Sequence, residues 1–317
     1  MDLYLGIDVG SVTTKVAAIG RDRSVVASLY RRTGGQPVEA VQKSLRELEE
    51  MLPADRVITG VGATGSGRQL AAVVAGADVV KNEITAHAVA ALHFVPDVHT
   101  AIDIGGQDSK LILLEDGIVV DFAMNSVCAA GTGSFLEQQA HRLGIAVEEL
   151  GERALRSQRP VRIAGRCTVF AESDMVHKQQ MGYPVDDILY GLCQALVRNY
   201  LNNLALGKTL HPPVVFQGGV AANRGVVRAF AEALGTEIIV PPQHEVMGAL
   251  GAALLALEYG TDSRPSAFRG FSAAEVAYRT SSFECHACPN ECEIAEVGVG
   301  QVVVARWGGR CGRWETV

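Results

Sequence analysis

Two isolated cysteines lie where an apolar run changes into a helical pattern. Cys128 stands in MNSVCAAGTGSFLEQQAHRLG and precedes an expected helix over 129–143. Cys167 stands in AGRCTVFAESDMVHKQQMG, between an expected short strand at 161–164 and another helix. A helix N-terminus stabilises a thiolate through its dipole and its free N–H groups. Both cysteines therefore suit metal or redox chemistry, and the competing interpretation is a pair of buried free thiols.

Two further segments place a carboxylate at a strand end and small residues in the turn that follows. They read DVGSVTTK from Asp8 and DIGGQDSK from Asp103. Glycine lets a phosphate approach backbone N–H groups, hydroxyls add donors, and a carboxylate can hold Mg²⁺. We therefore expect Asp8 and Asp103 to hold Mg²⁺. The expected phosphate ligands are Gly10, Ser11, Thr13, Thr14 and Lys15 in the first turn and Gly105, Gly106 and Gln107 in the second. Either segment alone is also compatible with an ordinary tight hairpin.

A third motif, VVFQGGVAAN, runs from an expected strand at 214–217 into paired glycines before a helix. Gly218, Gly219 and Asn223 are the residues that we expect to serve a nucleoside. Three motifs in this order predict an ATP site. Glu83 or Gln107 is the candidate for orienting the attacking water.

The C-terminal segment contains four closely spaced cysteines, Cys285, Cys288, Cys292 and Cys311. This spacing suits a structural Zn²⁺ or an iron–sulfur cluster, and His286 could replace one thiolate. Cys193 differs, because it lies within an apolar helical pattern and is expected in the core.

The elements that must position these residues repeat one plan. Strand, turn and strand over 3–19, with a third strand at 25–30, recur over 101–122, and IDVG at Ile7 aligns with IDIG at Ile102. This repetition predicts an internal duplication. Further strands are expected at 57–62, 214–217 and 238–240, and helices at 37–52, 83–94, 184–206, 223–234 and 245–257.

Composition limits the class of protein. The 317 residues are 48% hydrophobic and carry a net charge of −7, which disfavours a nucleic-acid footprint. The longest apolar run is about half of the roughly 20 residues that span a bilayer, so we expect a cytoplasmic protein without a membrane segment. Three parts are expected: residues 1–96 as one lobe, 97–260 as a second lobe, and 261–317 as a linker with a metal-binding tail.

The motif order resembles the sugar kinase, actin and Hsp70 superfamily. Within it, the chain is similar to the ATP-dependent activators of 2-hydroxyacyl-CoA dehydratases and to benzoyl-CoA reductase ATPase subunits, over roughly residues 3–258. The segments that carry the resemblance are IDVGSVTTKV, NEITAHA, IDIGGQDSK, the two segments around Cys128 and Cys167, and FQGGVAANRGV. It implies an α/β fold of duplicated actin-like, ribonuclease H-like ATPase lobes with a nucleotide cleft that takes ATP or ADP.

Two thiolates make half of a Cys₄ site, so a second copy of the chain is the economical completion. The resemblance likewise implies a homodimer sharing one [4Fe–4S] cluster on Cys128 and Cys167. It implies reduced ferredoxin or flavodoxin as electron donor and a dehydratase or reductase as acceptor. The alternatives are a small-molecule kinase of this superfamily and a regulatory nucleotide- and metal-binding module.

Overall fold

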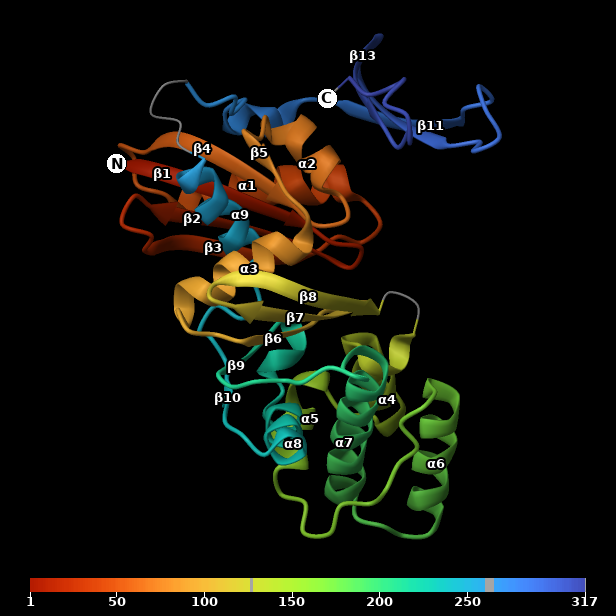
Figure 1. The fold of residues 1–317 in the computed structure, drawn as a ribbon. Coiled ribbons are helices and arrows are strands. Elements are labelled where there is room, and N and C mark those ends of the chain that lie inside the picture. Colours follow the sequence, from red (N-terminus) through yellow and green to blue (C-terminus); the bar gives the residue numbers. More distant parts are fainter. Residues whose placement is uncertain (126–127, 260–264, 317) are drawn as a thin grey trace. The chain divides into compact units, whose positions relative to one another are not determined.

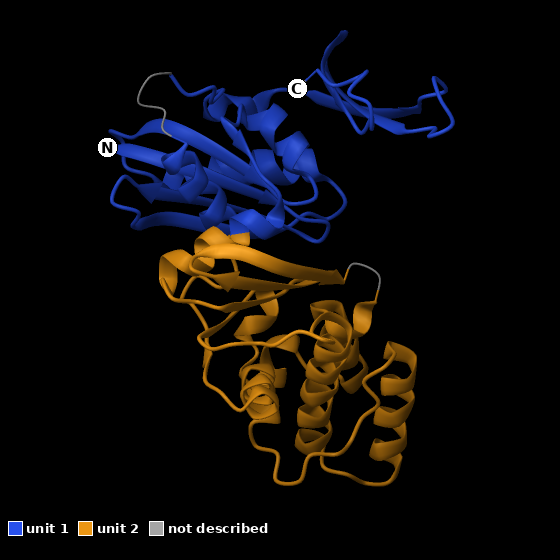
Figure 2. Ribbon diagram, in the orientation of Figure 1, with its two compact units in different colours: residues 1–86, 248–317 blue, residues 87–247 orange. Residues whose placement is uncertain are grey.

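The computed structural model describes residues 1–125, 128–259 and 265–316. The boundary expected at 260/261 and most of the expected linker lie outside these residues. The chain forms two compact units (Figure 2), unit 1 from residues 1–86 and 248–317 and unit 2 from residues 87–247. No helix among the described residues is long and apolar enough to cross a membrane.

Unit 1 contains a five-stranded sheet in the order β3-β2-β1-β4-β5 (Figure 1). Its strands are β1 (Asp2–Val9), β2 (Thr13–Gly20), β3 (Val25–Arg32), β4 (Val57–Thr64) and β5 (Val79–Val80). β1 pairs antiparallel with β2 and parallel with β4. Helix α1 (Pro37–Met51) buries Val41, Leu45 and Leu48 against this sheet, as its helical spacing predicts.

The C-terminal helix α9 (Met247–Glu258) belongs to unit 1, whereas the sequence-based division assigns it to the second lobe. Glycines on the sheet explain this packing. A Cβ on Gly6 would lie 1.8 Å from the Ala249 carbonyl oxygen, and one on Gly62 would lie 2.0 Å from that of Ala252. α9 therefore approaches β1 and β4 so closely that only glycine fits beneath it.

Unit 2 repeats the plan of unit 1 with the order β10-β9-β6-β7-β8. Its strands are β6 (Thr100–Ile104), β7 (Ser109–Glu115), β8 (Ile118–Asn125), β9 (Val214–Gln217) and β10 (Ile238–Ile239). The central strand β6 pairs antiparallel with β7 and parallel with β9, as β1 does with β2 and β4. This shared order and pairing supports the duplication that the sequence predicts.

Helices of unit 2 pack on its sheet around the long helix α7 (Val185–Leu204). Tyr200, Phe216 and Phe230 meet edge to face in this core. The other elements of the unit are α3 (Glu83–Phe94, which begins in unit 1), the 3₁₀ turn η1 (Ala129–Gly131), α4 (Gly133–Leu143), α5 (Val147–Ala154), α6 (Thr168–Gln180), the 3₁₀ turn η2 (Gly219–Ala222) and α8 (Arg224–Leu234).

The structure corrects two expectations around the cysteines. The expected strand at 161–164 is irregular backbone, because α7 satisfies its polar groups: Arg198 donates to the Ile163 carbonyl at 2.6 Å, and Val161 N–H donates to the Asp187 carbonyl. The expected helix at 129–143 is a 3₁₀ turn followed by α4. Thr132 has an extended backbone and separates the two.

Helix α2 (Arg68–Ala75), helix α5 and the C-terminal sheet are elements that the sequence did not predict. The C-terminal part of unit 1 begins with the 3₁₀ turn η3 (Phe271–Glu275). The antiparallel strands β11 (Tyr278–Glu284), β12 (Glu293–Val299) and β13 (Val302–Trp307) follow. Val297 and Ala305 pack on Leu70 and Val73 of α2, which joins this sheet to unit 1.

Gly6→Ala tests the packing of α9 on β1. Its Cβ would meet a backbone carbonyl, which cannot rotate away, so we expect the free energy of unfolding to fall by about 3 kcal/mol. Urea denaturation measures this loss. Gly34→Ala is the matched control in unit 1: its Cβ meets nothing within 4 Å, and its φ of 61° costs about 1 kcal/mol. Equal losses in the two variants would contradict the packing.

Candidate functional site

Each sheet presents a buried carboxylate at the end of its central strand. Asp8 ends β1 with 4% of its surface exposed, and Asp103 ends β6 with 2% exposed. Lys15 Nζ lies 3.1 Å from Asp8 Oδ2, and Lys110 Nζ lies 3.2 Å from Asp103 Oδ2. A buried carboxylate needs such a partner, because an isolated charge is costly away from water.

The two turns share their backbone geometry as well as their ion pairs. Asp8 lies opposite Lys15 in the β1–β2 ladder, and Asp103 lies opposite Lys110 in the β6–β7 ladder. Gly10 N–H donates to the Thr13 carbonyl at 2.9 Å, and Gly105 N–H donates to the backbone carbonyl of Asp108 at the same distance. The structure therefore places Lys15, expected on phosphate, beside the carboxylate expected on Mg²⁺.

Residues that the sequence did not single out lie beside both carboxylates. In unit 1, the loop between β4 and α2 packs against Asp8, since a Cβ on Gly65 would lie 2.5 Å from Asp8 Oδ1. In unit 2, the His87 imidazole lies 3.6 Å from Asp103 Oδ1 and 3.0 Å from the Gln217 amide nitrogen. The sequence signals were the TGSG run that ends β4 and the histidine inside NEITAHA.

The glycine turn of unit 2 is bonded directly to the start of α4. Gly133 N–H donates to the Gly105 carbonyl at 2.9 Å, and Ser134 N–H donates to the Gly106 carbonyl at 2.8 Å. The Ser134 hydroxyl also donates to Gly106. The expected phosphate turn and the segment after Cys128 thus form one hydrogen-bonded structure.

Asn125, the last residue of β8, holds Cys128 through both ends of its amide. Its Oδ1 accepts the Cys128 N–H at 2.9 Å, and its Nδ2 donates to the Cys128 carbonyl at 2.8 Å. Asn125 lies opposite Ser109 in the β7–β8 ladder, directly after the expected phosphate turn. Cys128 is half-buried and begins η1.

Cys167 is also half-buried and stands at the N-cap of α6, as expected of a cysteine at a helix start. Buried side chains of α7 hold the segment before it. Asn199 Nδ2 donates to the Gly165 carbonyl at 2.7 Å. The Oδ1 of the same amide packs against Gly131, where a Cβ would lie only 2.8 Å from it. One amide of α7 therefore touches both cysteine-bearing segments.

The neighbour of Asn199 on α7 reaches the expected phosphate hairpin. Tyr200 donates its hydroxyl to the Lys110 carbonyl at 2.6 Å, and both residues are buried. Consecutive residues of α7 thus contact the Asp103 hairpin and the backbone beside both cysteines. Cys193, on the same helix, is fully buried, and this desolvation raises the pKa of its thiol to about 12. Its expected place in the core is confirmed.

The expected nucleoside motif lies beside Asp103. Gly218 has a φ of 88°, and a Cβ there would approach the Ile104 carbonyl oxygen to 2.4 Å, so this turn requires glycine. Gly219 begins η2, and Asn223 is the N-cap of α8, where its side chain accepts the Val226 N–H at 3.1 Å. That oxygen of Asn223 thus has a structural partner.

The two candidates for positioning water lie in different units. Glu83 is the first residue of α3 and belongs to unit 1, whereas Gln107 is exposed in the β6–β7 turn of unit 2. Both stay candidates.

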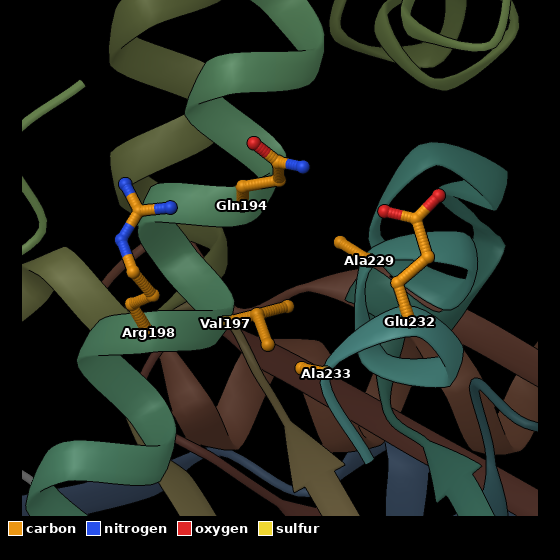
Figure 3. Close-up of a pocket in the computed structure, with 6 residues that line it drawn as sticks. All are labelled: Gln194, Val197, Arg198, Ala229, Glu232 and Ala233. Atoms are coloured by element: carbon orange, nitrogen blue, oxygen red, sulfur yellow. The ribbon is translucent and has the colours of Figure 1, made fainter. Parts of the chain in front are cut away.

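A hollow of about 220 Å³ lies between α7 and α8, away from these motifs (Figure 3). Val197, Ala229 and Ala233 form its apolar part, and Gln194, Arg198 and Glu232 its polar part. It contains none of the residues that the sequence assigned to ATP.

Large apolar side chains are exposed beside both cysteines. On β8, Phe122 is 54% and Met124 is 44% exposed, just before the Asn125–Cys128 segment. On α6, Val169 is 66% and Phe170 is 65% exposed, two and three residues after Cys167. Large contiguous exposed apolar patches mark interaction sites.

The sequence and the fold match known proteins over most of the chain. Residues 5–256 match the model of the BadF/BadG/BcrA/BcrD ATPase family. The (R)-2-hydroxyglutaryl-CoA dehydratase activating ATPase of Acidaminococcus fermentans is 39% identical over 81% of this chain and 98% of its own length. The activator of lactoyl-CoA dehydratase from Anaerotignum propionicum is 39% identical over 80% of this chain and 97% of its own.

A solved structure shows the same likeness. It is the activator of the 2-hydroxyisocaproyl-CoA dehydratase from Clostridium difficile with bound ADPNP, which superposes with a TM-score of 0.74. It is 35% identical and covers 83% of this chain and 97% of its own. The duplicated actin-like α/β fold that the sequence predicts is thereby confirmed.

Asn199→Ala tests whether α7 holds the segment before Cys167. The change leaves the half-buried Gly165 carbonyl without its donor, so we expect the free energy of unfolding to fall by about 2 kcal/mol. Amide exchange at residues 163–168, followed by mass spectrometry, should accelerate about tenfold. Asn202→Ala, at an exposed position of the same helix, should change neither quantity. Unchanged protection at 163–168 in Asn199→Ala would contradict this role.

Proposed function

Because the chain belongs to the BadF/BadG/BcrA/BcrD ATPase family, we propose that it is an ATP-dependent activator that passes single low-potential electrons to a partner enzyme. The partner is a 2-hydroxyacyl-CoA dehydratase or a related acyl-CoA reductase, as the names of its relatives suggest. The observation that carries the proposal is the bonding of the Gly105–Gly106 turn to α4, beside Cys128.

The nucleotide ligands are those of the two duplicated turns. Asp8 and Asp103 hold Mg²⁺, and the backbone N–H groups and hydroxyls of the two turns hold phosphates. Gly218 and Gly219 let the nucleoside approach the backbone. Lys15 and Lys110 lie 3.1 and 3.2 Å from these carboxylates and offset the cost of holding them away from water.

The residues around Cys128 and Cys167 fit a [4Fe–4S] cluster shared by two chains. The two cysteines are half-buried free thiols at N-cap positions, and the Asn199 amide touches both of their segments. Each chain contributes two thiolates, so two chains complete the Cys₄ set. When bound, the cluster supplies a one-electron redox centre.

The exposed apolar side chains beside the cysteines support the homodimer. Phe122, Met124, Val169 and Phe170 come from two elements that each lie next to one cysteine. A second copy of the chain would bury this apolar surface, and each Å² buried stabilises the dimer by about 25 cal/mol. Reduced ferredoxin or flavodoxin is the electron donor of the dimer, and the partner enzyme is the acceptor.

Two chains of hydrogen bonds in unit 2 connect the expected phosphate turn to the backbone beside the cysteines. In the first, the Gly105 and Gly106 carbonyls accept from the start of α4, which follows Cys128. In the second, Lys110 is bonded to Tyr200, whose neighbour Asn199 holds Gly165. A phosphate-dependent shift of this turn therefore moves the backbone beside both thiolates, as two-state switches require.

Asp8→Asn tests the Mg·ATP assignment. Neutralising this carboxylate removes a metal ligand, so we expect ATP hydrolysis at saturating Mg²⁺ to fall about 100-fold. Phosphate release measures the rate, and circular dichroism checks the fold. Asp22→Asn is the control, because that exposed carboxylate bonds Ser24 in the turn between β2 and β3. A full hydrolysis rate in Asp8→Asn would exclude the assignment.

Cys128→Ser tests the shared cluster. Four irons over two chains give about two per chain in anaerobically purified protein, and the variant should lose nearly all of them. Sedimentation should show a smaller dimer fraction. Cys311→Ser, in the C-terminal sheet, should keep both iron and dimer. Unchanged iron and mass in Cys128→Ser would rule out the shared cluster.

A further inference from the structure

The C-terminal sheet gathers the four remaining cysteines at one end. This region lies beyond residues 5–256, which match the family model, and the proposed function does not use it. Cys285, Cys288 and Cys292 lie in the connection between β11 and β12, and Cys311 follows β13. We propose that Cys285, Cys288, Cys292 and Cys311 form a tetrahedral site for one structural Zn²⁺ ion.

The ladder of β11 and β12 places two of the cysteines opposite each other. Glu284 pairs with Glu293, and the next pair is Cys285 with Cys292, whose backbones are joined by a 2.8 Å hydrogen bond. Residues in this position have Cα atoms about 5.5 Å apart. That separation lets two thiolates reach one ion.

The connection between these two cysteines turns back at the third. Glu291 N–H donates to the Cys288 carbonyl at 3.2 Å, and Glu291 has a φ of 43°, so residues 288–291 form a tight turn. Cys285 and Cys288 are spaced as a Cys-x-x-Cys pair, which is the ligand spacing that thiolate metal sites use.

The segment after β13 brings the fourth cysteine to the same end. Ala295 pairs with Trp307, and Gly308 approaches the Glu293 carbonyl so closely that a Cβ would lie 2.5 Å from it. Three residues beyond Cys311, Trp314 Nε1 donates to Cys285 Sγ at 3.2 Å. Cys311 therefore stands in the sequence between Gly308 and Trp314, and both of these residues contact the end of the sheet that carries Cys285 and Cys292.

The sheet has a small core and would gain from a metal. Residues 278–284 are mostly exposed, residues 302–307 are mostly half-buried, and the buried apolar side chains of β12 and β13 are Ile294, Val297 and Ala305. A sheet this small needs a staple, and metal binding supplies folding energy directly. Phe283 and Trp314, packed edge to face, cover the side of Cys285.

The present arrangement of side chains differs from a closed site. Among the described residues, no three cysteine sulfurs lie within 4.8 Å of one another, whereas single ligand atoms of Glu284, His286 and Glu291 do. Cys288 and Cys311 are exposed and can turn towards Cys285. Glu284 ends β11 and Cys285 follows it, so their side chains point to opposite faces of the sheet. The exposed group formed by Glu284, His286 and Glu291 is therefore separate from the cysteine site.

Metal analysis of the full chain tests the site. We expect one Zn²⁺ per chain after reconstitution with Zn²⁺ alone and removal of the excess. Cys288→Ser and Cys311→Ser should each bind Zn²⁺ at least about tenfold more weakly. The control with Glu284→Gln and His286→Ala together should keep the ion. No zinc in the wild type, or undiminished zinc in both cysteine variants, would overturn the proposal.

Two readouts keep the test independent of variant folding and of the proposed function. Co²⁺ added to the wild-type chain should give the visible bands of tetrahedral cobalt and a thiolate charge-transfer band; their absence would overturn the proposal. Cys128→Ser should lose iron and keep zinc, and Cys311→Ser should do the reverse. Loss of iron with Cys311→Ser would identify a tail iron–sulfur cluster and overturn the zinc assignment.

Discussion

The buried carboxylate at the end of each central strand is the constraint on which the site depends. Asp8 and Asp103 are each paired with a lysine on the next strand, at 3.1 and 3.2 Å, and a carboxylate taken out of water needs such a partner. The pairing fixes the register of each hairpin, and each hairpin fixes a glycine turn. Duplicating this unit gives each sheet a glycine turn closed by the same backbone hydrogen bond.

In unit 2 the hairpin also organises the cysteines. The Gly105–Gly106 turn accepts from the start of α4, Asn125 holds the Cys128 backbone, and α7 bonds Lys110 with one residue and Gly165 with the preceding one. These contacts are short, buried or half-buried and contiguous. They connect the Gly105–Gly106 turn to the backbone beside both cysteines, which is the path that a change at bound phosphates would take under the proposed function.

Periodicity and motif order predicted most of this. Alternating apolar runs predicted the strands, and the two IDxG turns predicted the duplication, because both signals are local. The contacts of Asn199, Tyr200 and His87 could not be predicted, since a polar residue on an apolar helix does not reveal its distant partner. The irregular segment before Cys167 resembled a strand because its apolar residues alternate, yet α7 supplies its hydrogen bonds. The motif spacing predicts Lys15 as a phosphate ligand, but spacing alone could not show that its ammonium lies 3.1 Å from Asp8.

We propose that nucleotide bound by the duplicated turns acts on a cluster held by Cys128 and Cys167. Electron paramagnetic resonance in a redox titration of the anaerobically purified protein tests this, with Mg·ADP and with Mg and a non-hydrolysable ATP analogue. We expect one cluster per two chains, with a spectrum and a midpoint potential that differ between the two nucleotides. Superimposable spectra and equal potentials, with both nucleotides shown to be bound, would exclude it.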